Sequence, residues 1–366
     1  MADITNPHGG NTTFSTELNN QNGAIPVIFE KKLALVLGAT GQAVTDNLTN
    51  RNFEGDIRKQ GDTVRIVIPD KPDRSLVQST SAKGGLGVCP VFHSFAPEAL
   101  DLVINKVQTF AVAIDDVQKA QTQFKGWLDA QASAYGQAMK EAKDIELIDE
   151  VFTYDPTASA TTDPEYTPSN HPLAGEYGTL AAPFSAANSG YDVNSQNIFT
   201  FLLKIKEDLI MTGAIGADGT YSYSPLSEET RDERAVILVT PAMHTLIMSS
   251  YRVGGRSVEM ADVVVKDGRV ERVAGLDIVV TKNLVEYAKD KNAQTVMPFI
   301  AGTRNAITIA EQLNKVEGSR DPFCFRDLMK VINLYGIKVV HPECIVRGAL
   351  PATNPNEAVP TKEVTP

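Results

Sequence analysis

Residues 107–152 read VQTFAVAIDDVQKAQTQFKGWLDAQASAYGQAMKEAKDIELIDEVF, and the spacing of their apolar residues changes part-way along. Large apolar side chains alternate with small or polar ones at Phe110, Val112 and Ile114, which predicts a strand with one apolar face. From Asp116 onward the apolar residues recur every three or four positions, as they do along one side of a helix. Such a helix would cover roughly 37 residues and about 55 Å. We therefore expect a strand followed by a long spine helix, along which the other elements pack.

Two aspartates, Asp115 and Asp116, mark the junction between the expected strand and the expected helix. A carboxylate at this place can accept hydrogen bonds from the free N–H groups of the first helical turn, and it interacts favourably with the helix dipole. Paired aspartates also serve as acid/base groups and metal ligands, but no His or Cys lies nearby to complete such a site. The pair is therefore predicted to cap the helix.

The overall composition is that of an ordinary folded protein. The chain has 366 residues, of which 42% are apolar and 22% are charged. A chain of this length can bury a sizeable core and form two or three compact units. No stretch approaches the ~20 consecutive apolar residues of a membrane span, and the first residues lack the basic and apolar blocks of a signal peptide. We therefore expect a cytosolic protein that does not enter a membrane.

The cysteine and histidine residues give no indication of a metal site. The three cysteines, Cys89, Cys324 and Cys344, include no CxxC pair, and none of the five histidines lies at metal-ligand spacing from another. No nucleophile lies in an elbow motif such as GxSxG, and no set of residues resembles an active site. We therefore predict no catalytic residues, no metal and no cofactor.

The balance of charge argues against broad nucleic-acid binding. The chain has 34 basic and 45 acidic residues, which gives a net charge of -11. Proteins that bind nucleic acid without sequence preference use clusters of Lys and Arg that release counterions. We therefore expect a chain that can lie near DNA without adhering to it.

One stretch offers an enzymatic alternative. Residues 33–44, LALVLGATGQAV, are similar to the strand and phosphate-binding turn of a nicotinamide-dependent enzyme. Gly38 and Gly41 fit that turn, but Val44 occupies the position at which a third small residue is usual. The chain then continues into turn-rich residues rather than into a second strand with an acidic end. An ordinary helix or helix break is favoured, and an enzyme that uses Gly38 and Gly41 stays open as an unfavoured alternative.

Strand and helix patterns surround the expected spine. Before it, strand patterns at residues 62–69 and 91–106 flank a segment rich in Pro and Gly, which predicts a long hairpin. The patterns after it are an exposed insertion without strand or helix at 156–196, an amphipathic helix at 197–212, a strand buried on both faces at 235–240, a short helix at 241–250, a hairpin turn at Asp267-Gly268, and strands within 301–350.

Five separated stretches together resemble the major capsid proteins of tailed bacteriophages, which have the Hong Kong 97-type fold. They are FEGDIRKQGDTVRIVIP (53–69), FAVAIDDVQKAQ (110–121), DERAVILVTP (232–241), GRVERVAGLDIVVTKNL (268–284) and LYGIKVVHPE (334–343). The stretches occur in the order of that family and span most of the chain after residue 50. The set and its order carry the resemblance, because no single motif is highly specific.

The resemblance implies an α+β fold with named parts. In chain order they are an N-terminal arm (1–52), an extended-loop hairpin (53–106), a peripheral domain with the long spine helix (107–155), an exposed insertion loop (156–196), an axial α/β domain (197–300), strands returning to the peripheral domain (301–350) and a disordered tail (351–366). The N-terminal region is too short for the large cleaved scaffolding segment of some members. We therefore expect a separate scaffolding protein.

The function implied by the resemblance is structural. Hexamers and pentamers of the chain would form an icosahedral head around a double-stranded DNA genome, without binding that DNA specifically. The expected partners are further copies of the chain, a scaffolding protein, a portal and, as in some members, a decoration protein. Assembly and procapsid maturation would take place in the bacterial cytoplasm and end in the virion. Candidates for contact between subunits are Lys71, Arg74, Lys83 and Arg256. The alternative is an encapsulin-like compartment shell, which encloses an enzyme instead of a genome.

Overall fold

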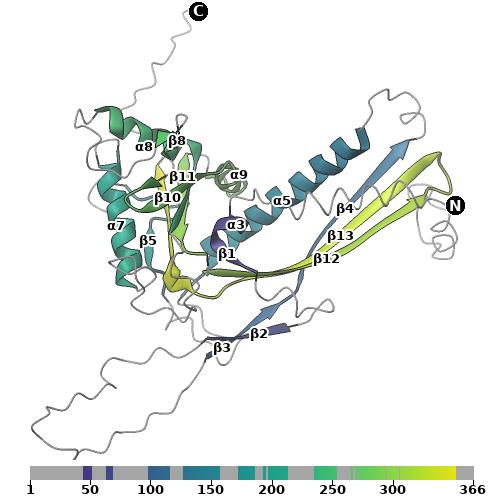
Figure 1. The fold of residues 1–366 in the computed structure, drawn as a ribbon, viewed down its shortest axis with the longest axis horizontal. Helices are drawn as coiled ribbons and strands as arrows, with labels where there is room; N and C mark the ends of the chain where they lie inside the picture. Colours follow the sequence, from purple (N-terminus) through teal and green to yellow (C-terminus); the bar gives the residue numbers. More distant parts are fainter. Residues whose placement is uncertain are drawn as a thin grey trace, which may run out of the picture.

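The computed structural model consists of a compact α/β block and a long limb that extends away from it (Figure 1). The structure describes residues 44–51, 63–68, 98–115, 127–156, 172–185, 193–194, 197–212, 235–253, 265–266, 269–270, 272–293, 295–304 and 306–351. The predicted arm before residue 44 and the predicted tail after residue 351 lie outside these ranges.

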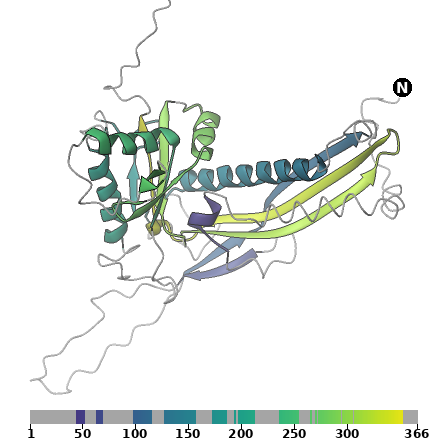
Figure 2. The same ribbon diagram turned by 45° about the horizontal axis from the view of Figure 1, so that its top comes forward.

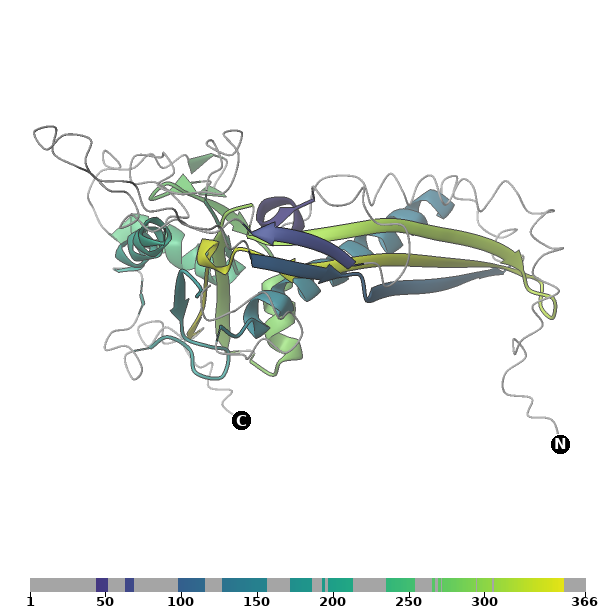
Figure 3. The same ribbon diagram turned by 90° about the horizontal axis from the view of Figure 1, so that it is seen from below.

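The limb is a four-stranded sheet with one long helix along it. Its elements are the short helix α3 (Thr45–Leu48), β1 (Thr49–Asn50), β4 (Lys106–Asp115), α5 (Trp127–Thr153), β12 (Ile307–Arg320) and β13 (Arg326–Val339). The strand order is β1-β12-β13-β4, in which β13 pairs antiparallel with both of its neighbours. Figures 2 and 3 show α5 running beside this sheet. The ring of Phe110 on β4 stacks on that of Tyr135 on α5, with centroids 5.1 Å apart.

The predicted strand and spine helix are confirmed over the described residues. Strand β4 contains all three alternating apolar residues, and α5 covers the C-terminal part of the predicted helix. Residues 116–126, where the helix was predicted to begin, lie outside the described ranges.

Strand β13 shows the two-residue period of a sheet with one covered face. Met329, Val331 and Tyr335 are buried, whereas Lys330 and Ile332 between them are exposed. The buried face is the one that α5 covers, because the Tyr335 hydroxyl reaches a carboxylate on that helix. The opposite face of the limb sheet is left open to solvent at Lys330 and Ile332.

A two-stranded hairpin packs beneath the limb. Strand β2 (Thr63–Ile68) pairs antiparallel with β3 (Glu98–Val103), so the predicted hairpin is confirmed at its base, and residues 69–97 lie outside the description. One side of the hairpin packs on the limb sheet through a small apolar cluster: Val64, Ile66, Leu100, Leu102, Ile104, Ala310 and Val340. On the other side Val67 and Val103 are exposed.

The α/β block is built on a six-stranded mixed sheet with the order β5-β14-β11-β6-β10-β9. Its elements are β5 (Gly175–Tyr177), α7 (Ile198–Met211), β6 (Val236–Val239), α8 (Pro241–Val253), β9 (Arg272–Val273), β10 (Leu276–Val280), α9 (Asn283–Asp290), β11 (Val296–Gly302), the short 3-10 helix η6 (Pro342–Cys344) and β14 (Ile345–Pro351). Helices α7 and α8 lie on one side of this sheet, and α9 lies on the other with the end of α5 (Figure 1).

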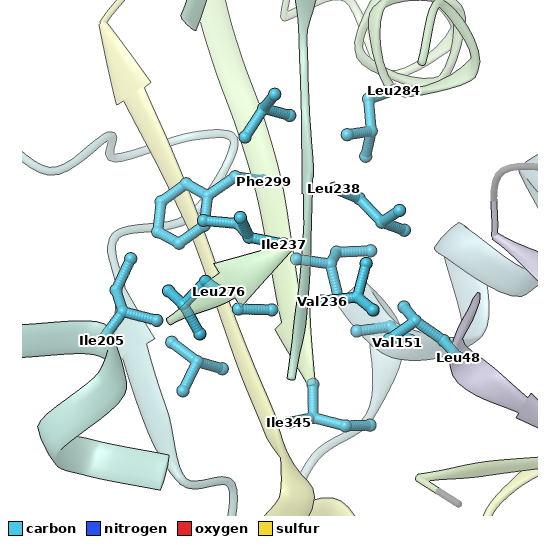
Figure 4. Close-up of a cluster of buried hydrophobic side chains, with 14 of the residues drawn as sticks. Leu48, Val151, Ile205, Val236, Ile237, Leu238, Leu276, Leu284, Phe299 and Ile345 are labelled. Carbon is cyan, nitrogen blue, oxygen red and sulfur yellow. The ribbon is translucent and has the colours of Figure 1, made fainter. Parts of the chain in front are cut away.

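Strand β6 is buried on both faces, as its continuous apolar sequence predicted. Ile237 points toward the side that holds Ile205 of α7, and Val236 and Leu238 point toward the side that holds Val151 of α5 (Figure 4). Helix α7 likewise confirms its predicted apolar stripe: its buried residues are Ile198, Phe201, Leu202, Ile205 and Leu209. The block therefore has two core layers, one on each side of the sheet.

Two antiparallel pairs of short strands follow one another before α9. Strand β7 (Val265–Lys266) pairs with β8 (Arg269–Val270), which confirms the hairpin predicted around residues 267–268, although the turn residues lie outside the description. Between β9 and β10, Ala274 and Gly275 have φ of 55° and 85°. Positive φ at both residues of a two-residue hairpin loop matches the twist of the strands that it joins.

Two sequence-based assignments are corrected by the block. Residues 156–196 were expected to form an insertion without strands, but residues 175–177 form β5, which pairs parallel with β14. Residues 301–350 were expected to return to the region of the spine helix. Strands β12 and β13 do so, but β14 pairs with β11 and lies inside the α/β block. The reason is physical: residues 345–350 are buried on both faces of β14, whereas the limb sheet leaves one of its faces exposed at Lys330 and Ile332.

Replacing Gly348 with Ala should lower the free energy of unfolding by about 1–3 kcal/mol. A Cβ atom at this position would lie 2.6 Å from Cζ of Phe299 and 2.6 Å from the backbone oxygen of Tyr177. The Tyr177 carbonyl belongs to the neighbouring strand β5 and cannot move away without disturbing the pairing of β5 with β14. Urea unfolding measures the loss, and a loss below about 0.5 kcal/mol would contradict this placement of β5.

Candidate interaction surfaces and the joint that supports them

Most residues that the sequence singled out lie outside the described part of the chain. These are Lys71, Arg74, Lys83, Arg256, Asp116, Gly38 and Gly41. Asp115 is the last residue of β4 and its side chain is exposed, while the description of the spine helix begins at Trp127. The helix-cap role of the two aspartates and the contact roles of the basic residues therefore stay predictions.

The described ranges contain no group of three or more His, Cys, Asp or Glu side chains that could hold a metal ion. Within the same ranges, no helix is both long enough and apolar enough to cross a membrane. The two described cysteines lie in different surroundings, since Cys324 is exposed and Cys344 is buried.

The limb ends in a short turn between β12 and β13, which we call the limb tip (residues 320–327, RDPFCFRD). Phe323 and Phe325 are 69% and 81% exposed there, and the exposed Cys324 lies between them in the sequence. Aromatic side chains bring a large apolar area to an interface and are enriched in protein contacts. Two such side chains side by side in the sequence make the limb tip a candidate interaction surface.

Two further groups of apolar side chains are exposed on the block and on the hairpin. Phe199, Leu203 and Met211 are exposed on α7, and Met211 is 79% exposed. Val67 and Val103 are exposed on the outer side of the β2–β3 hairpin. Scattered apolar residues are normal on a protein surface, so these two groups are weaker candidates than the limb tip.

A set of buried contacts, which we call the joint, attaches α5 to the α/β block and to the limb sheet. It is formed by Lys143 and Asp144 of α5, Arg347 of β14, and Tyr287 and Tyr335. Asp144 of α5 is a buried carboxylate with four hydrogen-bond donors around it. Its Oδ1 accepts from the backbone N–H and the hydroxyl of Thr45 at 3.2 and 2.7 Å, and its Oδ2 accepts from the N–H of Val44 at 3.4 Å and Nδ2 of Asn283 at 3.1 Å. Asp144 thus ties the start of α3 and the start of α9 to the spine helix.

The Asp144 carboxyl group should make stability depend on pH. Burial raises the pKa of Asp144 above its ordinary value, and the hydrogen bonds from Thr45 and Val44 offset only part of this effect. The folded state binds this proton more tightly than the unfolded state does, so protonation of Asp144 stabilises the fold at low pH. This contribution is lost as pH rises through the raised pKa. Relative to Asp144→Asn, the wild-type free energy of unfolding should therefore fall as pH rises from about 4 toward neutrality. Chemical unfolding at several pH values measures this, and parallel curves for the two proteins would contradict it.

A second buried contact in the joint is an ion pair between α5 and β12. The Lys143 Nζ atom lies 2.8 Å from Glu311 Oε2, and the Lys143 side chain is only 2% exposed. Nδ2 of Asn333 donates to the other oxygen of Glu311 at 2.8 Å, and Arg51 lies 4.0 Å from the carboxylate. Burial alone would raise the pKa of Glu311, but the charge and hydrogen bond of Lys143, the hydrogen bond of Asn333 and the charge of Arg51 together lower this pKa below its ordinary value.

Arg347 of β14 closes the C-terminal end of α5. Its Nη1 donates to the backbone oxygens of Val151, Phe152 and Tyr154 at 2.7, 3.1 and 2.8 Å. These carbonyls stand at the end of the helix, where no further helical N–H can reach them and where a positive charge is favourable. Nε and Nη2 of Arg347 also donate to Glu176 of β5, at 3.2 and 2.9 Å. One side chain therefore joins α5, β14 and β5.

Two tyrosine hydroxyls complete the attachment of α5. Tyr335 of β13 donates to Glu146 at 2.6 Å, and Tyr287 of α9 donates to Asp149 at 3.2 Å. Burial, followed by the effect of the neighbouring carboxylates, raises the pKa of both phenols well above the usual range. Both hydroxyls therefore keep their protons and act as donors at ordinary pH.

Neither the limb tip nor the joint was predicted from the sequence. The tip had a weak signal in residues 321–325, DPFCF, where a turn-forming Asp-Pro precedes two aromatic residues. The joint had none, because Lys143, Asp144 and Arg347 form contacts with residues far away in the chain.

Comparison with known proteins gives a fold match and no sequence match. No protein-family model and no curated protein matches the chain. A structure from Mycobacterium phage Che8 is 19% identical and matches 84% of this chain over 92% of its own, with a TM-score of 0.52. The capsid of the cyanophage P-SCSP1u is 15% identical over 82% of this chain and 84% of its own, with a TM-score of 0.52. The capsid of Ralstonia phage GP4 is 13% identical over 84% of this chain and 87% of its own, with a TM-score of 0.51.

The chain has the capsid fold of tailed phages. At these identities the likeness concerns the fold, which is α+β and of the Hong Kong 97 type. The resemblance inferred from five stretches of sequence is thereby confirmed. Within the Hong Kong 97-type fold, the limb tip stands at the end of the sheet that α5 accompanies, and the joint holds that sheet and α5 to the α/β block.

Proposed function

We propose that the chain is the major capsid protein of a tailed bacteriophage, a structural subunit without catalytic activity. Hexamers and pentamers of the chain build an icosahedral head around double-stranded DNA. The observation that carries this proposal is the fold match, which covers 84% of this chain and 92% of the Che8 phage chain. Two phage capsids match over similar shares of their length.

In this proposal each region of the chain has a part in the shell. Residues 1–52 are the N-terminal arm and residues 53–106 the extended loop that reaches over a neighbouring subunit. The limb, with α5 and the four-stranded sheet, is the peripheral domain, and the α/β block is the axial domain that meets its copies around the five-fold and six-fold axes. Strands β5 and β14 belong to the axial domain, because they pair inside its sheet.

The shape of the protein supports this role physically. The limb extends far from the block (Figure 2). Phe323 and Phe325 are exposed at its end. A two-stranded hairpin is at best marginally stable alone and gains stability by packing on another surface. Contacts of one surface with a different surface of the next copy generate rings when the rotation closes. Extended parts of this kind therefore gain their missing contacts through assembly.

The charge supports a container rather than a DNA-binding protein. A net charge of -11 keeps the chain from holding DNA tightly, so the packaged genome stays free to leave. The partners in this proposal are a separate scaffolding protein, a portal and, where present, a decoration protein. Assembly takes place in the bacterial cytoplasm and the product is the virion.

Light scattering of the purified protein, with negative-stain images of the same sample, tests the proposal. We expect particles of many megadaltons, or five- and six-membered rings, under assembly conditions. A species that keeps the monomer mass of 39.6 kDa at every concentration, with scaffolding protein present, would contradict it. Uniform closed shells without any helper would contradict only the separate scaffolding protein.

A further inference from the structure

We propose that residues 44–50 are a removable wedge that fixes the orientation of the limb relative to the α/β block. The wedge consists of Val44, α3 and β1. It stands in the sequence between the proposed N-terminal arm and the proposed extended loop, so contacts of either with another copy act on it. The fixed orientation is a property of the single chain. Its consequence for the direction in which a subunit extends its limb in a shell rests on the proposed function.

The wedge is too short to hold its own conformation. Helix α3 has four residues and β1 has two. An isolated single helical turn is unstable in water, because forming its first hydrogen bond fixes several backbone angles at once. Strand β1 adds two residue pairs with β12, Thr49↔Ile307 and Asn50↔Thr308. The surfaces around the wedge therefore impose its conformation, and the wedge behaves as a bound peptide.

Apolar side chains of the wedge reach both parts of the molecule. Val44 and Leu48 are 0% exposed and belong to the main core cluster. Figure 4 shows Leu48 on the side of the block sheet that also holds Val151 of α5. A Cβ atom on Gly302, the last residue of block strand β11, would lie 3.4 Å from Cδ2 of Leu48. Leu48 thus fills space where the block sheet meets the limb.

Polar contacts of the wedge join the same two parts. Asp144 of α5 accepts from the first two backbone N–H groups of the wedge, and it also accepts from Asn283 at the start of α9. Nη2 of Arg304, which lies between β11 of the block and β12 of the limb, donates to the backbone oxygen of Asp46 at 3.1 Å. The wedge is therefore bound to α5, to β12 and to the link between the two sheets.

The chain forms a natural axis where the block meets the limb. Residues 303–306 connect β11 to β12, and residues 340–344 connect β13 to β14. The N–H groups of Val340 and His341 both donate to the oxygen of Ala306, at 3.0 and 3.1 Å, so the two links lie side by side. Short links at the ends of strands are the usual places for a hinge. A contact away from these links is needed to fix the limb.

Helix α5 supplies that contact only while the wedge is in place. Arg347 binds the last turn of α5, and the wedge binds Asp144 about two turns earlier. A helix held at two points cannot tilt, whereas one held at its end can. The ion pairs of α5 with α9, Glu141–Lys282 and Asp149–Lys291, join partly exposed side chains and resist tilting weakly.

Distances between two spin labels measure the orientation directly in the unassembled chain. One nitroxide is attached at Glu207→Cys on α7 of the block, and the other at Lys330→Cys on β13 of the limb, since both positions are exposed. Cys89→Ser and Cys324→Ser remove two other thiols, and Cys344 is buried. Double electron–electron resonance should give one narrow distance distribution in this parent protein.

Leu48→Ala should loosen the wedge. The variant leaves a cavity where the wedge contacts the core, so we expect a distance distribution roughly twice as wide or wider, and amide exchange in residues 44–50 roughly tenfold faster or more. Thr45→Val removes only the hydroxyl that donates to Asp144 and should shift both readouts less, in the same direction. It keeps the test decisive if Leu48→Ala folds poorly.

Leu209→Ala is the matched control. Leu209 of α7 is also 0% exposed, but α7 lies on the opposite side of the block sheet from α9 and the end of α5 (Figure 1). The control should lower the unfolding midpoint as a core Leu→Ala change does, and it should leave the distance distribution as narrow as in the parent. A control as broad as Leu48→Ala would overturn the proposal, because the looseness would then follow from lost stability alone.

The outcomes separate the wedge from the proposed function. Distances in Leu48→Ala and Thr45→Val that match the parent would overturn the wedge and leave the capsid role standing. Under assembly conditions Leu48→Ala should give particles of mixed size where the parent gives one size, and uniform particles from both would overturn the consequence for the shell. A chain whose distances respond to Leu48→Ala but that forms neither rings nor shells would overturn the proposed function and support the wedge.

Discussion

Replacing Lys143 with Met should lower the free energy of unfolding by about 3 kcal/mol at neutral pH. The change removes the ammonium group that lies 2.8 Å from Glu311 and leaves a largely buried carboxylate without its principal partner. Asn333 at 2.8 Å and Arg51 at 4.0 Å remain, so the loss should stay near the lower end for a broken buried pair. Guanidinium unfolding followed by circular dichroism measures it.

The pH dependence of this loss has a defined sign. In the wild-type protein the pKa of Glu311 is lowered, so its charge stabilises the fold above its ordinary pKa of about 4.5, and this contribution is lost as pH falls through the lowered value. In the variant, burial acts without Lys143 and raises that pKa. The difference in stability between the two proteins should therefore shrink as pH falls.

A double variant and a matched control sharpen the test. Lys143→Met combined with Glu311→Gln removes both charges and should recover a large part of the loss, because the coupling of a buried pair amounts to about 0.5–3 kcal/mol. Lys106→Met removes a lysine that lies 3.6 Å from Glu146 and 3.8 Å from Glu150 of the same helix, with all three side chains partly exposed, and should cost less than about 1 kcal/mol. Equal losses for Lys143→Met and Lys106→Met would contradict a buried joint.

Replacing Arg347 with Met should cost about 3–5 kcal/mol. The methionine fills much of the same space but donates no hydrogen bond, so the backbone oxygens of Val151, Phe152 and Tyr154 lose their donor in a buried place. Hydrogen exchange should rise first in the last turn of α5, because that turn loses its only cationic cap among the described residues. Chemical unfolding gives the total loss.

The nearby acid separates the two roles of Arg347. Glu176→Gln keeps an oxygen acceptor for Nε and Nη2 of Arg347 but removes the ion pair, whose glutamate side chain is 44% exposed. This variant should cost less than about 1 kcal/mol. A loss for Glu176→Gln as large as for Arg347→Met would mean that the ion pair, rather than the helix end, is what Arg347 stabilises.

The elements that could be predicted from the sequence are those whose pattern repeats along the chain. The spacing of apolar residues predicts which faces are buried in β4, α7 and β6. Each of these elements lies where it was predicted. The hairpin of β2 and β3 was predictable for the same reason, since alternating apolar residues flank a segment rich in turn formers. Periodicity thus identifies an element and the face that it buries.

Periodicity does not identify the partner of that face. Strand β5 is only three residues long and lies among Pro and Gly, so nothing local distinguishes it from a loop. Strand β14 follows two limb strands in sequence but lies in the block, where it pairs with β11. Its local sequence does not show which of the two sheets it joins. The resemblance to phage capsid proteins supplied the overall architecture, but it placed β14 with the peripheral strands and missed β5.

The joint and the candidate interaction surfaces were harder to predict than the fold. Asp144 and Lys143 look like ordinary helix positions, because their meaning lies in contacts with Thr45 and Glu311, about a hundred or more positions away in the chain. Phenylalanine is usually buried, so the exposure of Phe325 could not be predicted from its residue type. It follows from the position of the turn at the end of the limb. The basic residues chosen from the sequence lie outside the described ranges and stay predictions.

An electron cryo-microscopy reconstruction of the assembled protein decides whether this chain is a capsid subunit. We expect closed icosahedral shells in which each subunit contributes its α/β block to a five- or six-membered ring and extends its limb to a neighbouring ring. Particles without icosahedral symmetry, such as open filaments or a small closed oligomer, would contradict the assignment of this chain as a capsid subunit.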